Sequence, residues 1–210
     1  MIQYARKHNS FIVEDDYDSE FRFNGSPVQS MHSLDPSSVI YVGTFSKTFM
    51  PSLRMGYLVL PDSLYAQLEN AKYIADLHSP ILEQFTMAKF IEKGFLDLHI
   101  KKMRNQYLKK RNYLIKCLTE IFGDAVRISG TEAGMHLVAS FNGIYFDQVL
   151  MQTIEYNNLE ISALRKHYIP DKNSIGIQNS YDNALIFGYG NTSFEAIEAG
   201  ILRLQMILSS

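Results

Sequence analysis

The sequence contains a single cysteine, Cys117, and it lacks an excess of either charge. One cysteine excludes an internal disulfide and a metal site built from several cysteines, and it fits a reducing compartment such as the cytoplasm. The 20 basic and 22 acidic residues give a formal net charge of −2, which disfavours electrostatic binding to nucleic acid or to an anionic membrane. We therefore expect no direct nucleic-acid binding by this segment.

Long hydrophobic runs are also missing. No apolar stretch reaches the ~18 residues that a membrane span needs. The opening stretch MIQYARKHNS contains no apolar core of the signal-peptide kind. Hydrophobic residues make up 46% and charged residues 20%, which is typical of a soluble globular chain. We expect a cytoplasmic protein without a membrane partner, and 210 residues suffice for one large or two small domains with a buried core.

Short apolar runs bounded by turn signals predict three strands in the first part of the chain. The run at 11–13 ends in three acids, Glu14–Asp16, and two further runs follow at 39–43 and 55–60. Helical patterns with start and stop signals come next, at 62–77, 81–93 and 95–122. Strands that alternate with helices are typical of the α/β and α+β classes.

The pattern changes after Gly123, where shorter strands and two helices are expected. The strands are predicted at 125–129, 135–141, 159–162 and 184–188, and the helices at 146–157 and 193–208. The long helix between the halves is the natural boundary, so we place one domain at 1–105 and another at 106–210. The stretch from Lys101 to Arg111 holds six basic residues and no acid, and we interpret it as a solvated helix face.

Carboxylates follow the first predicted strand directly. Ligands in open α/β sheets bind at the carboxyl ends of parallel strands, where Asp15 would lie beside Asp16 and Tyr17. Asp15 could hold a metal, act as a base or pair with a buried cationic nitrogen, or these acids could simply cap the next turn. Asp18 and Glu20 add carboxylates, so a magnesium-dependent phosphatase built on Asp15 and Asp16 is an alternative. That alternative gives Tyr17 and Arg54 no roles, and we assign no residue as a metal ligand.

Small hydroxyl residues surround a lysine directly after the second predicted strand, in Gly43-Thr44-Phe45-Ser46-Lys47. Hydroxyls and backbone N–H groups there could satisfy phosphate oxygens. A partly desolvated Lys47 would have a lowered pKa and an amine free for Schiff-base chemistry. Arg54 follows seven residues later and could bind the same phosphate with two hydrogen bonds. A surface lysine in a loop is the alternative interpretation.

The order of these features resembles the pyridoxal-phosphate (PLP) enzymes of fold type I, the aspartate aminotransferase superfamily with its class I and II enzymes. Asp15 ends a strand and is followed 32 residues later by Lys47 of a Ser-Lys pair, and then by Arg-x-Gly. The stretches VEDDYDSEFRF, VIYVGTFSK and LRMGY look like MocR/GabR-type regulators. In that family, a winged helix-turn-helix domain of the GntR type is fused to an aminotransferase-like domain.

The resemblance implies an α/β fold. Residues 1–105 would be the C-terminal part of the PLP-binding large domain, with a mainly parallel sheet and helices, and residues 106–210 a small α+β C-terminal domain. In the family, a long stretch precedes the Asp-x-Tyr strand and contains the DNA-binding domain, a linker and the first part of the large domain. We therefore expect this chain to form a homodimer or to associate with a missing N-terminal portion.

The resemblance also implies roles for individual residues. Lys47 would be the catalytic lysine that forms the internal aldimine with PLP. Asp15 would pair with the protonated pyridine nitrogen and keep the ring an electron sink. Tyr17 would donate a hydrogen bond to the phenolic oxygen of the ring.

The remaining roles concern anionic groups. Thr44, Ser46 and Arg54 would hold the cofactor phosphate. The carboxylate of a small-molecule amino compound should meet an arginine from the second half, and Arg165 is the candidate, with Lys166 as its rival and a basic surface cluster as the alternative.

Three functions remain open. The first is a PLP-binding, effector-sensing domain of a MocR-type transcriptional regulator without its DNA-binding domain. The second is a genuine class I/II aminotransferase that acts on an amino acid, and the third is a non-catalytic remnant. As a fragment, the chain is expected to bind PLP weakly, because part of the phosphate cup lies upstream in the family.

Overall fold

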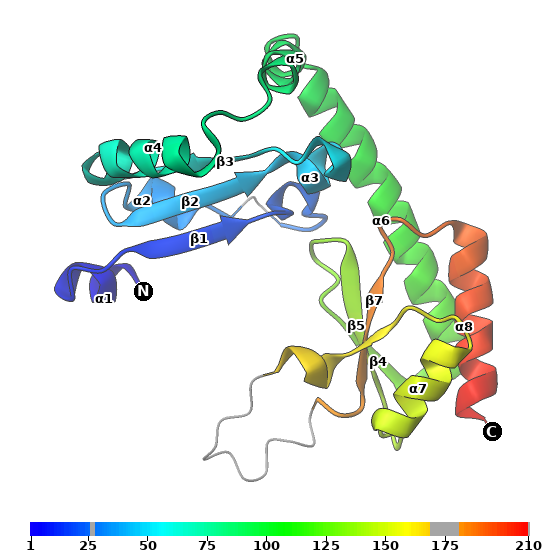
Figure 1. Cartoon of the computed structure of the whole chain (residues 1–210). Coiled ribbons are helices and arrows are strands. Elements are labelled where there is room, and N and C mark those ends of the chain that lie inside the picture. Colours follow the sequence, from blue (N-terminus) through cyan, green and yellow to red (C-terminus); the bar gives the residue numbers. More distant parts are fainter. Residues whose placement is uncertain (26–27, 169–180, 210) are drawn as a thin grey trace. The chain divides into compact units, whose positions relative to one another are not determined.

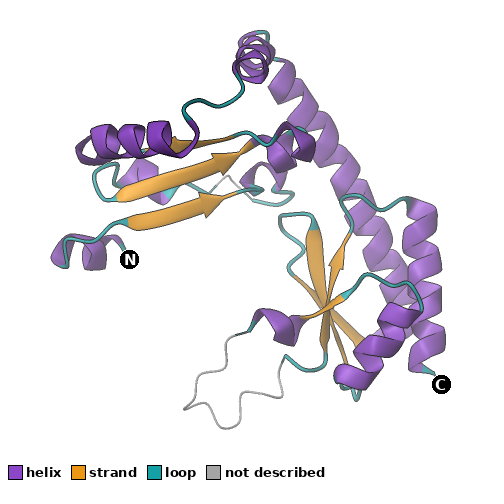
Figure 2. Cartoon of the chain, in the orientation of Figure 1, coloured by secondary structure: helices purple, strands orange, loops and turns teal. Residues whose placement is uncertain are grey.

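Two separate β-sheets organise the chain, one in each of two units that comprise residues 1–103 and 104–210 (Figures 1 and 2). The structure is a computed structural model that describes residues 1–25, 28–168 and 181–209. No helix in these residues is both long and apolar enough to cross a membrane.

The sheet of the first unit has three strands, β1 (Ile12–Asp16), β2 (Val39–Thr44) and β3 (Gly56–Val59), in that order. β1 and β2 are parallel, whereas β3 runs antiparallel to β2. The sheet is therefore mixed, which qualifies the expectation of a mainly parallel one. The reason is the short connection from β2 to β3, because a parallel neighbour would require a crossover of a dozen or more residues.

The sequence pattern predicts the long helices of the first unit but not the short ones. Three long ones agree with the predicted ranges to within two residues: α4 (Asp62–Asp76), α5 (Ile81–Glu92) and α6 (Phe95–Phe122), which continues into the second unit. Short ones have too few residues to show a periodic pattern, and they are α1 (Ile2–Lys7), α2 (Met31–Leu34), α3 (Phe45–Thr48), η1 (Ser19–Phe21) and η2 (Pro51–Leu53). α2 and α3 each begin after a hydroxyl side chain, of Ser30 and Thr44, that accepts a backbone hydrogen bond.

The second unit contains a four-stranded antiparallel sheet in the order β4-β5-β7-β6. Its strands are β4 (Val126–Ser129), β5 (His136–Phe141), β6 (Ser162–Ala163) and β7 (Ala184–Gly188). Its further helices are η3 (Gly123–Ala125), α7 (Gln148–Tyr156), η4 (Leu164–His167) and α8 (Phe194–Leu208). The strand expected at 159–162 is reduced to the two residues of β6, which pair with the middle of β7.

The two units differ in how much apolar surface they bury. Of the 23 buried hydrophobic side chains among the described residues, only Ala5, Phe21, Val39 and Met87 belong to the first unit. In the second unit, alternate residues of β5 are buried, and the rings of Phe122, Phe141 and Phe146 form edge contacts with centroids 5.1 and 5.5 Å apart. The second unit therefore has a conventional core, whereas the first leaves most of its apolar side chains accessible.

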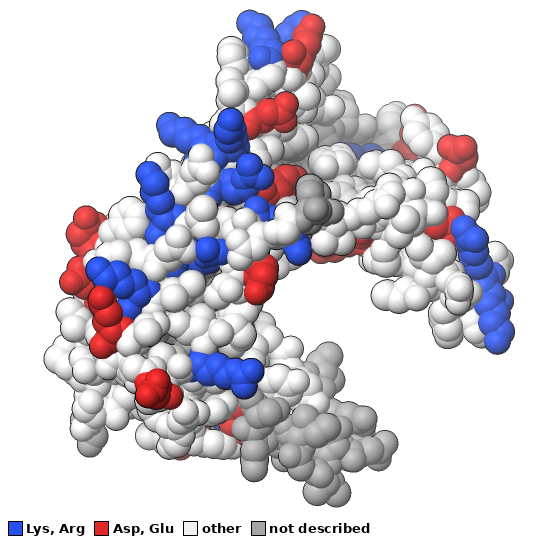
Figure 3. Space-filling view, turned by 180° about the vertical axis from the view of Figure 1, so that it is seen from behind, with Lys and Arg blue, Asp and Glu red and all other residues white. Residues whose placement is uncertain are grey.

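The basic stretch on α6 is only partly a solvated face. Arg111 is buried, and its Nη1 donates to the carbonyl of Thr131 at 2.6 Å. Lys110 donates to the carbonyl of Gly190 at 2.8 Å. The other four basic residues of the stretch are exposed, and Figure 3 shows basic side chains at the surface. The interpretation as a purely solvated face is thus wrong for two of the six residues, because both satisfy carbonyl groups of loops in the second unit.

A buried carboxylate ties α1 to the turn before β2. Asp35 accepts a hydrogen bond from Nε of Arg6 at 2.8 Å and from the hydroxyls of Ser37 and Ser38. These donors stabilise the charged form, so the pKa of Asp35 lies well below the ordinary value of 3.8. The group contributes stability that is complete above its ordinary pKa and is lost as the pH falls toward the depressed value.

We predict that Asp35→Asn lowers the free energy of unfolding at neutral pH, because the buried site loses a charged acceptor that three side chains share. The difference from the unmodified chain should shrink as the pH falls below 3.8, since the stabilisation by the charged form is then being lost. Urea unfolding as a function of pH measures this. Asp76→Asn is the matched control, because its partner Lys72 and Asp76 itself are half exposed, and an equal loss there would contradict the prediction.

Candidate cofactor site

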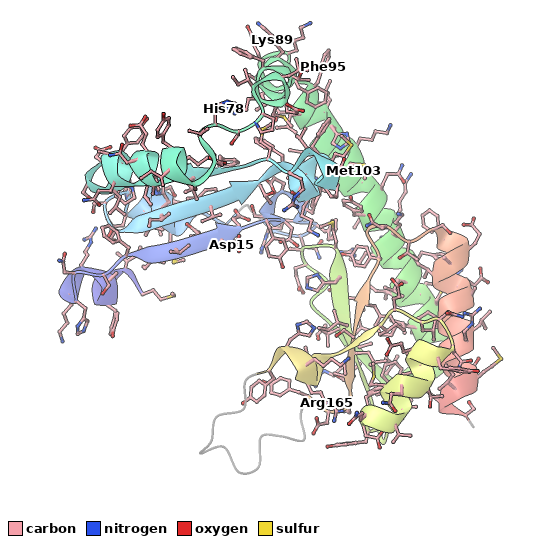
Figure 4. The ribbon with its side chains drawn as sticks, in the orientation of Figure 1. Asp15, His78, Lys89, Phe95, Met103 and Arg165 are labelled. Carbon is pink, nitrogen blue, oxygen red and sulfur yellow. The ribbon has the colours of Figure 1, made fainter. Side chains whose placement is uncertain are left out.

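The two aspartates at the end of β1 point to opposite faces of the first sheet, since side chains alternate along a strand. Asp15 is paired in register with Val42 and Asp16 with Gly43. Asp15 is exposed and lies at the carboxyl end of β1 (Figure 4). Two residues after Val42, on the same face as Asp15, comes Thr44 at the end of β2.

Tyr17 follows β1 directly, and its side chain is 44% exposed. The pKa of its phenol is raised, first by the negative charge of Asp18 and then by burial and by Asp15. Tyr17 is therefore a neutral hydrogen-bond donor at physiological pH, located two residues after the exposed Asp15.

The lysine of the predicted motif lies in α3, the single helical turn that follows β2. Thr44 caps this turn, because its Oγ1 accepts from the N–H of Ser46 at 3.1 Å. The Ser46 side chain is half-buried, whereas the Lys47 side chain is exposed. The expectation of a partly desolvated lysine is thus wrong for this chain, because α3 directs Lys47 to the surface. The N–H of Phe45 donates to the carbonyl of Met55 at 3.0 Å, so α3 is held against the start of β3.

Arg54 stands at the turn that returns the chain into β3. Its backbone is left-handed, with φ of 50° and ψ of 38°, where it ends η2. A non-glycine residue pays roughly 1 kcal/mol for this conformation, which surrounding contacts must offset. The exposed Arg54 lies in the segment that connects β2 to β3, which follows Thr44 and also contains Ser46. Asp15 lies on β1, the strand that pairs with β2.

Two glycines allow β2 and β3 to approach closely at this point. A Cβ on Gly56 would lie 2.9 Å from the carbonyl oxygen of Gly43. A Cβ on Gly43 would lie 2.3 Å from Cζ of Tyr57, so the tyrosine ring occupies the space over Gly43. The sequence assigned no role to Tyr57 or to its neighbour Tyr41, because strand position is their only signal.

The structure thus gathers six candidates at one end of the sheet of the first unit: Asp15, Tyr17, Thr44, Ser46, Lys47 and Arg54. The remaining candidates, Arg165 and its rival Lys166, lie in η4 of the second unit. Among the residues that the structure describes, no group of three or more His, Cys, Asp or Glu side chains is placed to hold a metal ion.

Comparison with known protein families identifies the family of this chain. Residues 1–171 match the family described as aminotransferase class I and II. The chain belongs to this family. The expected resemblance and the α/β fold are thereby confirmed.

Relatives within the family include transcriptional regulators. The chain is 34% identical over 206 residues to the uncharacterized HTH-type transcriptional regulator YhdI of Bacillus subtilis, and 32% identical to the probable rhizopine catabolism regulatory protein MocR of Rhizobium meliloti. Both alignments cover 98% of this chain but only 42% and 40% of the relatives. The chain is thus an aminotransferase-like domain that closely matches MocR-type regulators and spans about two fifths of their length.

Solved aminotransferases share the fold. The multiple substrate aminotransferase of Thermococcus profundus superposes with a TM-score of 0.82 at 25% identity, over 99% of this chain and 50% of that one. LysN, the α-aminoadipate aminotransferase of Thermus thermophilus, was solved with N-(5'-phosphopyridoxyl)-L-leucine and superposes with a TM-score of 0.81 at 24% identity, over 99% of this chain and 52% of that one.

We predict that Gly56→Ala destabilises the first unit by ~1–3 kcal/mol, the usual cost of overpacking. The new Cβ would press on a backbone oxygen of β2 that cannot turn aside. Gly188→Ala in β7 is the control, because nothing lies within 4 Å of its added Cβ. Urea unfolding compares the two variants, and equal losses would argue against a required close approach of β2 and β3.

Proposed function

We propose that this chain binds pyridoxal 5'-phosphate covalently through Lys47 and is the effector-sensing, aminotransferase-like part of a MocR-type transcriptional regulator. The observation that carries the proposal is the cluster of Asp15, Thr44, Ser46, Lys47 and Arg54 at one end of a single sheet. In the domain arrangement we propose, residues 1–105 are the C-terminal part of the cofactor-binding large domain and residues 106–210 the small C-terminal domain.

The donor chemistry of the cluster fits the cofactor. Two hydroxyls and a guanidinium supply hydrogen bonds suited to a phosphate, and they come from Thr44, Ser46 and Arg54. The exposed amine of Lys47 is one residue beyond Ser46, and the carboxylate of Asp15 stands on the adjacent parallel strand. A phosphate, an aldehyde and a cationic ring nitrogen would each find a partner of the matching kind.

When bound, PLP supplies an electron sink that stabilises negative charge developing on an amino substrate. Asp15 would keep the proton on the ring nitrogen, because an adjacent anion raises the pKa of a cationic acid. Tyr17 would donate a hydrogen bond to the phenolic oxygen of the ring. The amine of Lys47 would be the base that takes and returns the proton at the α-carbon of the amino compound.

The small-molecule partner we propose is an amino compound with a carboxylate that Arg165 binds. Arg165 is half-buried in η4. This short helix directly follows β6, so the backbone of Arg165 is held close to the sheet of the second unit. In a regulator, binding of such a compound would shift a conformational equilibrium rather than serve turnover. The same role fits a cytoplasmic location and a free, reduced Cys117.

A genuine amino-acid aminotransferase is the second candidate. It is favoured by 34% identity over 141 residues to the aromatic-amino-acid aminotransferase 1 of Thermococcus litoralis, an alignment that covers 67% of this chain and 34% of that enzyme. Incubation with PLP, an amino acid and a keto acid distinguishes the candidates, because only the enzyme converts both substrates repeatedly.

We predict that the full chain forms a coloured adduct with PLP, which borohydride reduction traps on Lys47 and peptide mass spectrometry locates. Lys47→Ala should abolish the adduct, whereas Lys93→Ala, at another exposed lysine of the first unit, should leave it intact. Arg54→Ala should weaken binding about tenfold, the equivalent of ~1.4 kcal/mol. An adduct distributed over surface lysines would contradict the proposed site.

The exposed apolar side chains of the first unit support the proposal of a macromolecular partner. Leu58 on β3 is 52% exposed, Ile74 on α4 83% and Leu82 on α5 76%. Within the described residues, β1 and β3 have no further strand on their outer edges. Large exposed apolar side chains and unpaired strand edges are features of interfaces. We propose that the surface packs against a second copy of the chain or against further portions of a longer protein.

We predict concentration-dependent association of the isolated chain in sedimentation velocity experiments. Leu58→Lys should shift the distribution toward monomer, because a charge would be buried at the interface. Leu202→Lys, at a 45% exposed position on α8 of the second unit, should not. A stable monomer that unfolds cooperatively at every concentration would rule out the proposed association.

A further inference from the structure

The carboxylate of Asp16, which the cofactor roles leave unused, is held by three hydrogen bonds. Its Oδ1 accepts from the N–H of Ser19 at 3.2 Å, and its Oδ2 accepts from the Ser19 hydroxyl at 2.6 Å and from the Tyr41 hydroxyl at 2.7 Å. Ser19 begins η1, and Tyr41 lies in β2. One side chain thus joins the end of β1, the turn that contains Tyr17, and the adjacent strand.

The hydroxyl of Tyr41 remains protonated over the accessible pH range. Burial, followed by the hydrogen bond to Asp16, raises the pKa of this phenol far above its ordinary value. The ring of Tyr57 lies beside it, with centroids 6.1 Å apart, and burial raises the pKa of Tyr57 as well. Tyr41 is therefore a constant donor to Asp16, packed against a second neutral phenol.

The contacts continue from Tyr57 to the lysine helix. The Tyr57 ring occupies the space over Gly43 and contacts the ring of Phe45, with centroids 5.5 Å apart. Phe45 is the first residue of α3, the helix that contains Lys47. An unbroken series of contacts therefore runs from Ser19 through Asp16, Tyr41 and Tyr57 to α3.

We propose that Asp16, held by Ser19 and Tyr41, is a positioning residue that fixes the turn bearing Tyr17 relative to the helix bearing Lys47. The inference rests on the proposed function and deepens it. Asp16 points to the face of the sheet opposite Asp15, so it acts through other residues rather than on the cofactor. The series would keep the phenol and the amine at a constant separation while ligands bind and leave.

The chemistry of the three donors explains why an aspartate is required here. The Ser19 N–H, the Ser19 hydroxyl and the Tyr41 hydroxyl all donate, and an ionised carboxylate is acceptor-only. An asparagine would turn an NH₂ group toward at least one of these donors. Asp16→Asn therefore preserves the size of the side chain but loosens either the turn or its link to β2.

Tyr41→Phe is the sharpest test, because it deletes the hydrogen bond to Asp16 and keeps the ring. Tyr145→Phe is the matched control, since Tyr145 donates to Asp182 at 3.0 Å within the second unit. We expect Tyr41→Phe and Asp16→Asn each to weaken PLP binding about three- to tenfold. Both should also shift the pH at which the colour of the Lys47 adduct changes, and the double variant should be no weaker than the worse single one. Tyr145→Phe should alter neither property.

Hydrogen exchange of the cofactor-free chain provides an independent readout. Tyr41→Phe should accelerate amide exchange both at residues 17–19 and at residues 46–47, while the midpoint of thermal unfolding falls no more than in Tyr145→Phe. Acceleration confined to residues 17–19, or unchanged PLP affinity and pH profile, overturns the positioning role. If the unmodified chain forms no Lys47 adduct, the proposed function fails, and the exchange at residues 46–47 still decides whether the coupling exists.

Discussion

The candidate site depends on the close pairing of β2 with both of its neighbours. β1 delivers Asp15 by parallel pairing, and the return strand β3 delivers Arg54 by antiparallel pairing. The β2–β3 pairing depends on Gly56, because a Cβ there would press on the backbone oxygen of Gly43, and Gly43 leaves room for the ring of Tyr57. β2 is therefore the strand that holds the segments bearing Asp15 and Arg54 on either side of the segment bearing Lys47.

The unequal cores of the two units give this site a particular setting. The second unit is stabilised by buried aromatic and aliphatic side chains, whereas the first, which contains Lys47, buries few and exposes many. Apolar burial is the dominant stabilising contribution in folding. The first unit is therefore the less stable of the two, and a binding partner would stabilise it most. A regulator can use this property, because ligand binding and association then stabilise the same part of the chain.

The relatives of this chain are of two kinds. The family match covers residues 1–171, and the relatives are named both as HTH-type regulators and as an aromatic-amino-acid aminotransferase. The proposed site around Lys47 is compatible with a sensing domain and with an enzyme. In the function we propose, the separation of the two depends on how Arg165 of the second unit binds the amino compound, and on portions that the relatives have beyond the two fifths matched here.

The sequence by itself determined the long helices, the strand positions and the residues of the motif, because hydrophobic period, glycine breaks and residue order are local signals. It also placed Asp15 at the end of one strand and Thr44 and Lys47 directly after the next. Only the tertiary structure decided the antiparallel direction of β3, the burial of Arg111 and the linkage of Asp16 through Tyr41 and Tyr57 to α3. Each of these depends on contacts between residues distant in the chain, and a local pattern records which face a side chain occupies but not what it meets there.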